Sequence, residues 1–433
     1  MKRATFVFLV ALATLTGCSR GAEEASEQEA TSGQEVEATA AAELPVEGIA
    51  MAAIDPGDVE LDIYAIDVGQ GDATLIVGPD VNAERFAMLI DAGRGTSTRA
   101  VEPLLEHAGV TELDVFVATH YDEDHVGGAV TASGKSVLWT TDQVNGEVEC
   151  DARSFFPTVA IVDPGPSPEI TDTEKEWDHC VAELTGGTGE PEHVEVMNGN
   201  NLGKTFNLGG NYTATIVAGG GHVLGTTGAI ENADSKNEMS VAVLVSNLAG
   251  FDFLVTGDLI GQPSNPNQPN ALENAPLEQK LGEKMEADGI EVEILQVGHH
   301  GAANATENDF IKAIQPKIAI ISVGMKNNHG HPHNRTLATL ESNNVPIILQ
   351  TSAGKRRASD PPPHEFDECD DNDPSCKDTT QVSVNGTFHI EVAGDKYDIK
   401  SLEDSSYYFE QEGVETLIIS LECDASGCDE VVE

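Results

Sequence analysis

The stretch Ala118-Thr-His-Tyr-Asp-Glu-Asp-His-Val-Gly-Gly128 carries four potential metal ligands within six residues, namely His120, Asp122, Asp124 and His125. It follows an apolar run from Leu113 to Ala118 that has the β-branched and aromatic content of a buried strand. A strand that ends in a polar turn presents its next side chains together at the edge of a sheet. Imidazole nitrogens and carboxylate oxygens bind divalent cations. A solvated acidic turn is the alternative, but the strand and the paired glycines favour a metal centre.

The N-terminal residues predict export. Lys2 and Arg3 precede an apolar stretch from Ala4 to Leu15, and small residues lead from there to Cys18. This order is typical of a secretory signal over residues 1–18. The apolar stretch itself is too short to form a membrane-spanning helix. Cys18 resembles the lipobox cysteine of bacterial lipoproteins, which implies a lipid-bearing N-terminus, and Ser19 favours the outer membrane. We therefore expect an exported protein that is lipid-anchored to the outer membrane, on its periplasmic or cell-surface side. An ordinary signal peptide with a chance cysteine is the alternative.

Composition divides the rest of the chain. Residues 19–57 contain many Glu, Ala, Gly and Ser but almost no aromatics, which predicts a disordered acidic linker. One elaborated domain is expected over residues 58–400, with a loop-rich insertion at about 133–210 and an acidic insertion at about 355–380. Residues 401–433 are expected to form a C-terminal extension. No second apolar stretch is long enough to span a bilayer.

The net charge limits the choice of partners. The chain has 74 acidic and 23 basic residues, which give a formal charge of −51. A charge of this size repels polyanions at long range and excludes tight, non-specific binding of nucleic acid through a basic face. Any role on DNA therefore depends on metal ions at the site.

The cysteines predict disulfides. Seven are present, and removal of Cys18 leaves an even number, as expected of disulfides in an exported chain. The close spacings predict local bridges Cys369–Cys376 and Cys423–Cys428, which leaves Cys150 to pair with Cys180. A zinc cluster is the competing interpretation, but the chain has no Cys-x-x-Cys motif.

One construction recurs along the chain: an apolar strand, followed by a short polar turn that carries His or Asp. It occurs at Asp91, at His120 to His125, at Asp258 and at His299 and His300. Helical spacing of apolar residues predicts helices at about 97–108, 276–287, 306–314 and 336–342. Strands dominate the first half, and strands alternate with helices in the second. This order favours an α/β protein with helices outside two sheets.

Six ordered segments between about residues 60 and 350 resemble the metallo-β-lactamase fold superfamily of metal-dependent hydrolases. Within it, the chain is most similar to the soluble domain of ComEC-type competence proteins. The segments are Asp67-Val-Gly-Gln-Gly-Asp72, Leu89-Ile-Asp-Ala-Gly93, Thr119-His-Tyr-Asp-Glu-Asp-His-Val-Gly-Gly128, Thr256-Gly-Asp258, Val297-Gly-His-His-Gly301 and Gly330-His-Pro-His333. The resemblance implies a four-layer αββα sandwich with disulfide-bearing insertions and a one- or two-metal site at the edge of its sheets.

The same resemblance implies a ligand set. His120 and Asp122 would hold the first metal. Asp124, His125 and a histidine of the Gly-His-His-Gly turn would hold the second, with Asp258 bridging the two. His299 is preferred over His300 because it follows the strand and the glycine directly.

Two departures from the family pattern affect this ligand set. The superfamily usually has His where this chain has Asp122, so the site is richer in oxygen ligands, and manganese or magnesium become plausible beside zinc. The histidine of the third family motif has no clear counterpart. His222 is a candidate, although the ComEC-type pattern places Asn237 and Ser240 near this point.

Further residues receive roles from this chemistry. A bound cation lowers the pKa of coordinated water from about 16 towards 7 and so supplies hydroxide. Asp124 is placed to orient this nucleophile. Asp72 and Asp91 are expected to orient ligand histidines from behind, with turn stabilisation as the alternative. His331, and less strongly His333, could donate to a phosphate oxygen or protonate a leaving group; a capped turn at a helix start is their alternative role.

The sequence thus predicts a metal-dependent hydrolase that uses a metal-bound hydroxide and one or two divalent ions, with zinc or manganese favoured. Resemblance favours a phosphodiesterase or nuclease, with DNA among the candidate substrates beside other small hydrolysable molecules. A β-lactamase or lactonase on the same fold is one alternative. A non-catalytic surface binding protein with a degraded site is the other.

Overall fold

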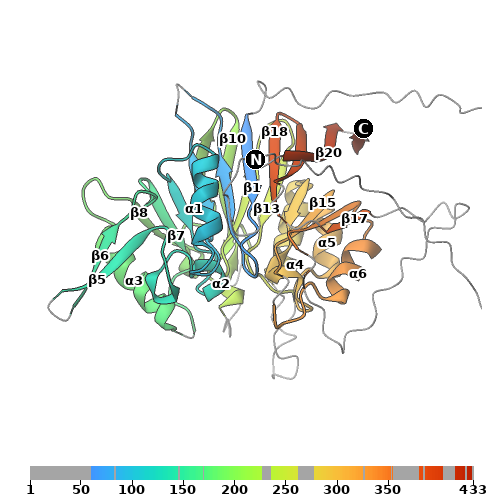
Figure 1. Ribbon diagram of the computed structural model, residues 1–433. Coiled ribbons are helices and arrows are strands. Elements are labelled where there is room, and N and C mark those ends of the chain that lie inside the picture. The colour runs from blue at the N-terminus through green and yellow to red at the C-terminus, as the bar shows by residue number, and fades with distance from the viewer. Residues whose placement is uncertain are drawn as a thin grey trace, which may run out of the picture. The chain divides into compact units, whose positions relative to one another are not determined.

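Two β-sheets pack face to face in the computed structural model, and helices cover their outer faces (Figure 1). The structure describes residues 60–81, 84–144, 147–168, 170–226, 236–261, 277–324, 327–352, 354, 380–383, 386–402, 415–424 and 427–431. The signal with Cys18, the linker 19–57, and Cys369 and Cys376 within the acidic insertion lie outside these residues. Within the described part, no helix is long and apolar enough to cross a membrane.

The first sheet has ten strands among the described residues, in the order β21-β20-β19-β18-β1-β2-β3-β4-β7-β8. They are β1 (Leu61–Ala65), β2 (Thr74–Val77), β3 (Ala87–Ile90), β4 (Val115–Val117), β7 (Ala160–Asp163), β8 (Glu192–Glu195), β18 (Thr387–Ala393), β19 (Lys396–Leu402), β20 (Glu415–Asp424) and β21 (Gly427–Val431). The strands from β3 to β8 run parallel to one another, and the others pair antiparallel.

The second sheet follows the order β11-β10-β12-β13-β14-β15-β16-β17, and β9 also pairs with β10. Its strands are β9 (Thr205–Gly209), β10 (Tyr212–Gly219), β11 (His222–Val223), β12 (Ala242–Ser246), β13 (Asp252–Val255), β14 (Ile294–Gln296), β15 (Ile318–Ile321), β16 (Ile347–Gln350) and β17 (Thr380–Ser383). From β13 to β17 the strands run parallel. A separate hairpin pairs β5 (Trp139–Val144) with β6 (Glu147–Ala152).

Three apolar layers hold these elements together and confirm the predicted αββα sandwich. Alternate strand residues such as Val115 and Val117 of β4 face the second sheet, while Phe116 faces the helices on the other side. Helices α1 (Thr98–His107) and α3 (Asp172–Leu184) pack on the first sheet. The second sheet is covered by α4 (Leu277–Asp288), α5 (Asn308–Ile314) and α6 (Asn334–Ser342), which lie together in Figure 1.

Two segments have more regular structure than the sequence suggested. Residues 133–210, expected to be loop-rich, contain β7 and β8 of the first sheet and the helix α3. Trp177, Cys180 and Val181 form the buried face of α3, but the charged residues between them hide its helical period. The expected C-terminal extension is also part of the fold, because β20 and β21 continue the first sheet beyond β19.

The predicted pairing of Cys150 with Cys180 is confirmed: this disulfide joins β6 to α3. The register of β20 and β21 sets Cys423 opposite Cys428 along the backbone. Their side chains lie outside the described part, so that bridge stays a prediction.

Candidate metal centre

Polar turns from the two sheets meet where parallel strands end. In the first sheet, Asp91 follows β3 and the His120–His125 motif follows β4. In the second sheet, Asp258 follows β13 and the turn at Gly298–Gly301 follows β14. The motif forms the short helix α2 (Glu123–Val126), and the turn forms η4 (Gly298–Gly301). Neighbouring parallel strands end at the same edge of a sheet, which explains why residues far apart in sequence converge here.

Backbone contacts fix the motif against the first glycine turn. The N–H of Asp72 donates to the carbonyl oxygen of Asp124 at 3.0 Å, and the N–H of Ala92 donates to that of His125 at 2.8 Å. Gly71 has φ +139°, and a Cβ there would lie 2.2 Å from the carbonyl oxygen of Asp124. Any other residue would therefore push the ligand-bearing turn away, which explains the glycine at this position.

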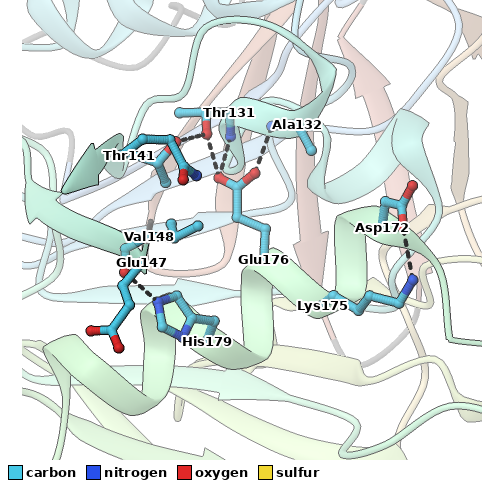
Figure 2. A pocket seen from close by; sticks show the side chains of 10 residues that line it. Thr131, Ala132, Thr141, Glu147, Val148, Asp172, Lys175, Glu176 and His179 are labelled. Atoms are coloured by element: carbon cyan, nitrogen blue, oxygen red, sulfur yellow. Dashed lines mark hydrogen bonds and ion pairs between the residues drawn. The ribbon is translucent and has the colours of Figure 1, made fainter. Parts of the chain in front are cut away.

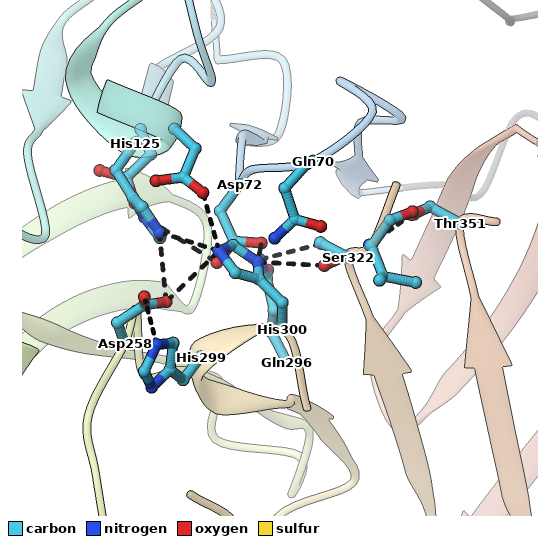
Figure 3. Close-up of polar contacts among 12 residues, drawn as sticks. Gln70, Asp72, His125, Asp258, Gln296, His299, His300, Ser322 and Thr351 are labelled. Atoms are coloured by element: carbon cyan, nitrogen blue, oxygen red, sulfur yellow. Dashed lines mark hydrogen bonds and ion pairs between the residues drawn. The ribbon is translucent and has the colours of Figure 1, made fainter. Parts of the chain in front are cut away.

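One half of the centre gathers around His125 and His300 (Figure 3). Their Nε2 atoms lie 3.3 Å apart. Asp258 Oδ1 lies 3.1 Å from His125 Nε2 and 3.7 Å from His300 Nε2. Asp124 Oδ2 approaches His300 Nε2 to 3.6 Å. Asp72, His125, Asp258 and His300 form a buried group. Each offers one ligand atom, and these atoms all lie within 4.8 Å of one another.

The other half faces the second oxygen of Asp258. Asp258 Oδ2 lies 3.8 Å from His120 Nε2 and 3.6 Å from His299 Nε2. Asp122 Oδ2 in turn lies 3.4 Å from His120 Nε2. The two oxygens of Asp258 thus divide the surrounding histidines into two pairs.

This division reverses the preference between the two neighbouring histidines. His299 was expected beside Asp124 and His125, but His300 occupies that place, and its Nδ1 bonds to the carbonyl oxygen of Ser322 at 3.1 Å. Both histidines adopt a left-handed backbone, with φ 52°. The chain therefore turns sharply after Gly298. His299 lies beside the other oxygen of Asp258, with its Nε2 3.6 Å from Oδ2 and 3.1 Å from Asn237 Nδ2.

Asp91 lies behind His125, as its expected orienting role requires. One of its oxygens lies 2.7 Å from His125 Nδ1 and also accepts from the Thr119 hydroxyl, and the other accepts from the Thr119 N–H at 2.8 Å. This contact fixes the ring so that Nε2 faces Asp258. Asp72 belongs to the buried group, and its oxygens lie 3.6 Å from Nδ1 of His300 and 4.0 Å from Nδ1 of His125, which suits the expected orienting role as well.

The electrostatics of the centre favour positive charge. Burial opposes ionisation of Asp258, but the neighbouring His125, His299 and His300 outweigh it and hold the pKa of this carboxyl well below its usual range. Burial lowers the pKa of His300, but Asp258 and Asp72 more than compensate and raise it to about 9. The carboxylates therefore attract a cation into a buried position.

The residues fit a divalent metal ion. Several buried atoms have no hydrogen-bond partner among the described residues: both oxygens of Asp72, Asp258 Oδ1 and His120 Nε2. Leaving such atoms unpaired in the interior is costly. A set of imidazole nitrogens and carboxylate oxygens that converge without partners is what zinc or manganese coordinates.

The remaining predicted histidines differ in position. The ring of His331 lies 5.7 Å from that of His299 and 6.1 Å from that of His300, so it borders the centre. Burial, followed by the charges of His300 and His299, lowers the pKa of His331 to about 3. His333 caps α6 by accepting from the Arg335 N–H. His222 bonds to the carbonyl oxygen of Gly220, and the structure does not bring it to the cluster.

Two basic residues at the centre were missed by the sequence analysis. Arg94 Nη2 lies 3.7 Å from Asp124 Oδ2, and Lys236 forms an ion pair with Asp122 Oδ1. Arg94 follows the Asp-Ala-Gly turn directly and Lys236 precedes Asn237. Their closeness to the family segments was the available signal.

The segment after the motif is anchored by the helix α3. Glu176 accepts from the backbone N–H groups of Thr131 and Ala132 at 2.6 and 2.7 Å (Figure 2). It also accepts from the indole N–H of Trp139 at 3.0 Å. A pocket of about 720 Å³ lies here, between η1 (Thr131–Ser133), the β5–β6 hairpin and α3. The Cys150–Cys180 disulfide joins this hairpin to the same helix.

Comparison with known proteins agrees with this site. Residues 66–135 match the model of the metallo-beta-lactamase superfamily. The chain is 26% identical over 312 residues to ComE operon protein 3 of Bacillus subtilis (strain 168), covering 68% of this chain and 32% of that protein. It is 25% identical over 291 residues to Recombination protein 2 of Haemophilus influenzae, covering 64% of this chain and 26% of that protein. A solved diphosphatase of the PhnP family aligns over 76% of this chain and 98% of its own, with 10% identity and a TM-score of 0.33.

The chain therefore has the metallo-beta-lactamase fold and is similar in sequence to ComEC-type competence proteins. The aligned region spans about a third or less of the length of these relatives. The fold and the buried group of Asp72, His125, Asp258 and His300 together indicate a hydrolase site for divalent metal.

Proposed function

We propose that this chain, with the metallo-beta-lactamase fold and a resemblance to ComEC-type competence proteins over about two thirds of its length, is a metal-dependent phosphodiesterase that acts on DNA. The observation that carries the proposal is the division of buried imidazole and carboxylate groups by the two oxygens of Asp258. The two groups of imidazole and carboxylate ligands beside Asp258 would hold up to two cations, which would supply the charge stabilisation that displacement at phosphorus needs.

The chain's own residues have separate tasks in this proposal. Asp124, His125, His300 and Asp258 Oδ1 would hold one cation, and His120, Asp122, His299 and Asp258 Oδ2 the other. When bound, such ions lower the pKa of water and stabilise charge on the leaving oxygen. Asp124 accepts a proton from the attacking water, and His331 donates a hydrogen bond from a ring nitrogen to a non-bridging oxygen of the substrate.

DNA is proposed as the substrate because the relatives bear names that refer to competence and recombination. The large negative charge of the chain is compatible with this substrate, since metal ions at the site can attract the phosphate locally.

An activity panel tests the proposal. Purified protein loaded with manganese or zinc is given single- and double-stranded DNA, bis-p-nitrophenyl phosphate and nitrocefin. We expect cleavage of the phosphodiesters and none of nitrocefin, and a loss of at least about 1,000-fold for Asp258→Asn. Asp172→Asn, on an exposed carboxylate of α3, is the control that keeps full activity. Equal rates for wild type and Asp258→Asn, or a protein that takes up no metal, would refute the proposal.

We further propose export and lipid attachment at Cys18. Labelling with a palmitate analogue should mark the wild-type protein in membranes, and the Cys18→Ser variant should lose the label. Equal labelling of the two would exclude the anchor.

A further inference from the structure

Two basic side chains flank the metal centre from different elements. Arg94 comes from the loop after β3, and its Nη2 lies 3.7 Å from Asp124 Oδ2 while its Nη1 lies 3.6 Å from Glu123. Lys236 comes from the segment before β12 and pairs with Asp122 Oδ1. The pairs thus involve Asp122 and Asp124, which are two residues apart in one motif.

Each basic group contacts a ligand carboxylate and still reaches solvent. Asp122 turns Oδ1 to Lys236 and Oδ2 to His120, and Asp124 Oδ2 is shared between Arg94 and His300. The side chains of Lys236 and Arg94 are 16% and 41% exposed. Both groups are therefore accessible to a substrate beside the ligand carboxylates.

The negative charge of the centre gives Arg94 and Lys236 an electrostatic role. Six carboxylates lie close to Arg94 or to the histidine rings of the centre: Asp72, Asp91, Asp122, Glu123, Asp124 and Asp258. Two divalent cations would leave two of these negative charges uncompensated. The cations would then attract an anionic phosphodiester less strongly, in a chain that already carries a charge of −51. Arg94 and Lys236 supply the two missing positive charges.

We propose that Arg94 and Lys236 form the phosphate-binding clamp of this centre and select a singly charged phosphodiester as substrate. This inference rests on the proposed function. Asp124 Oδ2 faces both Arg94 and His300, so a cation held there would leave the guanidinium N–H groups of Arg94 available to the substrate. Lys236 contacts Asp122 Oδ1, the oxygen that does not face His120, and can keep this contact beside the substrate. The planar guanidinium of Arg94 binds the two non-bridging oxygens in a fork, and Lys236 adds a point charge from the other side.

Binding and kinetics test the clamp in the full-length protein. A fluorescein-labelled, single-stranded oligodeoxythymidylate is titrated in calcium at several salt concentrations, and bis-p-nitrophenyl phosphate is assayed in manganese. For Arg94→Ala and for Lys236→Ala we expect about tenfold weaker oligonucleotide binding and a salt slope that falls by about 0.7 per removed cation. We also expect KM to rise about tenfold while kcat changes less than about twofold.

Controls separate the clamp from a structural role. Lys204→Ala removes a lysine directly before β9 that is also paired with a glutamate and 26% exposed, and it should leave binding and slope unchanged. Manganese affinity, measured by calorimetry, should stay within about threefold of wild type in both clamp variants. Altered manganese affinity with an unchanged salt slope would overturn the clamp and assign the two residues to charge neutralisation of the ligands. If the wild type is active and both variants cleave and bind as well as it does, the clamp alone would be overturned. A wild type that neither binds nor cleaves phosphodiesters would overturn the proposed function with it.

Discussion

His125 and His300 bring their Nε2 atoms to 3.3 Å from each other, although they follow strands of different sheets. The Nδ1 atoms of both rings face acceptors, Asp91 Oδ2 and the Ser322 carbonyl oxygen, so a ring that also donated from Nε2 would be charged. Asp258 Oδ1 lies beside both Nε2 atoms. A shared cation satisfies all three groups at once. The metal centre therefore exists only when the two sheets are packed together.

The two neighbouring histidines should serve different cations. His300→Ala is expected to weaken metal binding by more than about 100-fold on the side of Asp124 and His125, since it removes a direct ligand. His299→Ala should weaken binding beside His120 and Asp122 instead. Metal content after dialysis, measured by mass spectrometry, should fall by one equivalent in each variant. His222→Ala should keep the wild-type content, and full content in His300→Ala would contradict the assignment.

Asp91 should act through His125. Asp91→Asn keeps the size of the side chain but weakens the 2.7 Å contact with His125 Nδ1, so metal affinity should fall about 10- to 100-fold. Calorimetric titration with manganese measures this loss. Asp163→Asn is a matched control, because Asp163 is equally buried and its Oδ2 lies 2.7 Å from His193 in the same sheet. The same loss in both variants would mean that general destabilisation is the cause.

Glu278 should make stability depend on pH. Burial raises the pKa of this carboxyl to about 8, against the lowering effect of hydrogen bonds from the N–H groups of Thr306 and Glu307. The folded state therefore binds the proton more tightly than the unfolded state. Its contribution to the free energy of unfolding is fully present below about pH 4.5 and is lost as pH rises through 8.

Denaturant unfolding in EDTA at pH 5 and pH 8 measures this contribution. The difference in unfolding free energy between wild type and Glu278→Gln should change by an amount on the order of 3 kcal/mol over this interval. Asp172→Asn, on an exposed carboxylate, should show a difference from wild type that hardly varies with pH. A constant difference for Glu278→Gln as well would disprove the assignment.

The Cys150–Cys180 disulfide should stabilise the fold without taking part in catalysis. It closes a segment of 30 residues, and the chain-entropy relation gives a stabilisation of about 3 to 4 kcal/mol. The double variant Cys150→Ser/Cys180→Ser should unfold at correspondingly lower denaturant concentration while its activity per folded molecule stays the same. Unchanged unfolding, or a specific loss of activity, would show that the bridge has another role.

The fold was predictable from sequence wherever apolar period and turn chemistry agreed. The run from Leu113 to Ala118 and the helix near residues 98–107 are examples, since each buries one clear set of side chains. α3 was missed because its buried face is interrupted by charged residues. The candidate site residues were found by their ordered motifs. The choice between His299 and His300 depends on a left-handed turn, and Arg94 and Lys236 depend on how separate loops meet, neither of which sequence spacing reveals.

The pairing of β1 with β18 has a consequence for biosynthesis. The N–H of Asp67 donates to the Thr387 hydroxyl across 320 residues, and the whole length of β1 pairs with β18. During translation β1 therefore has a partner on one side only until residues 387–393 have emerged, and closing so long a loop is slow. A chain interrupted after Gln350 would present this apolar strand as an open edge, which is a template for association between molecules. Such a fragment should appear in the pellet after centrifugation, while the complete chain stays in the supernatant.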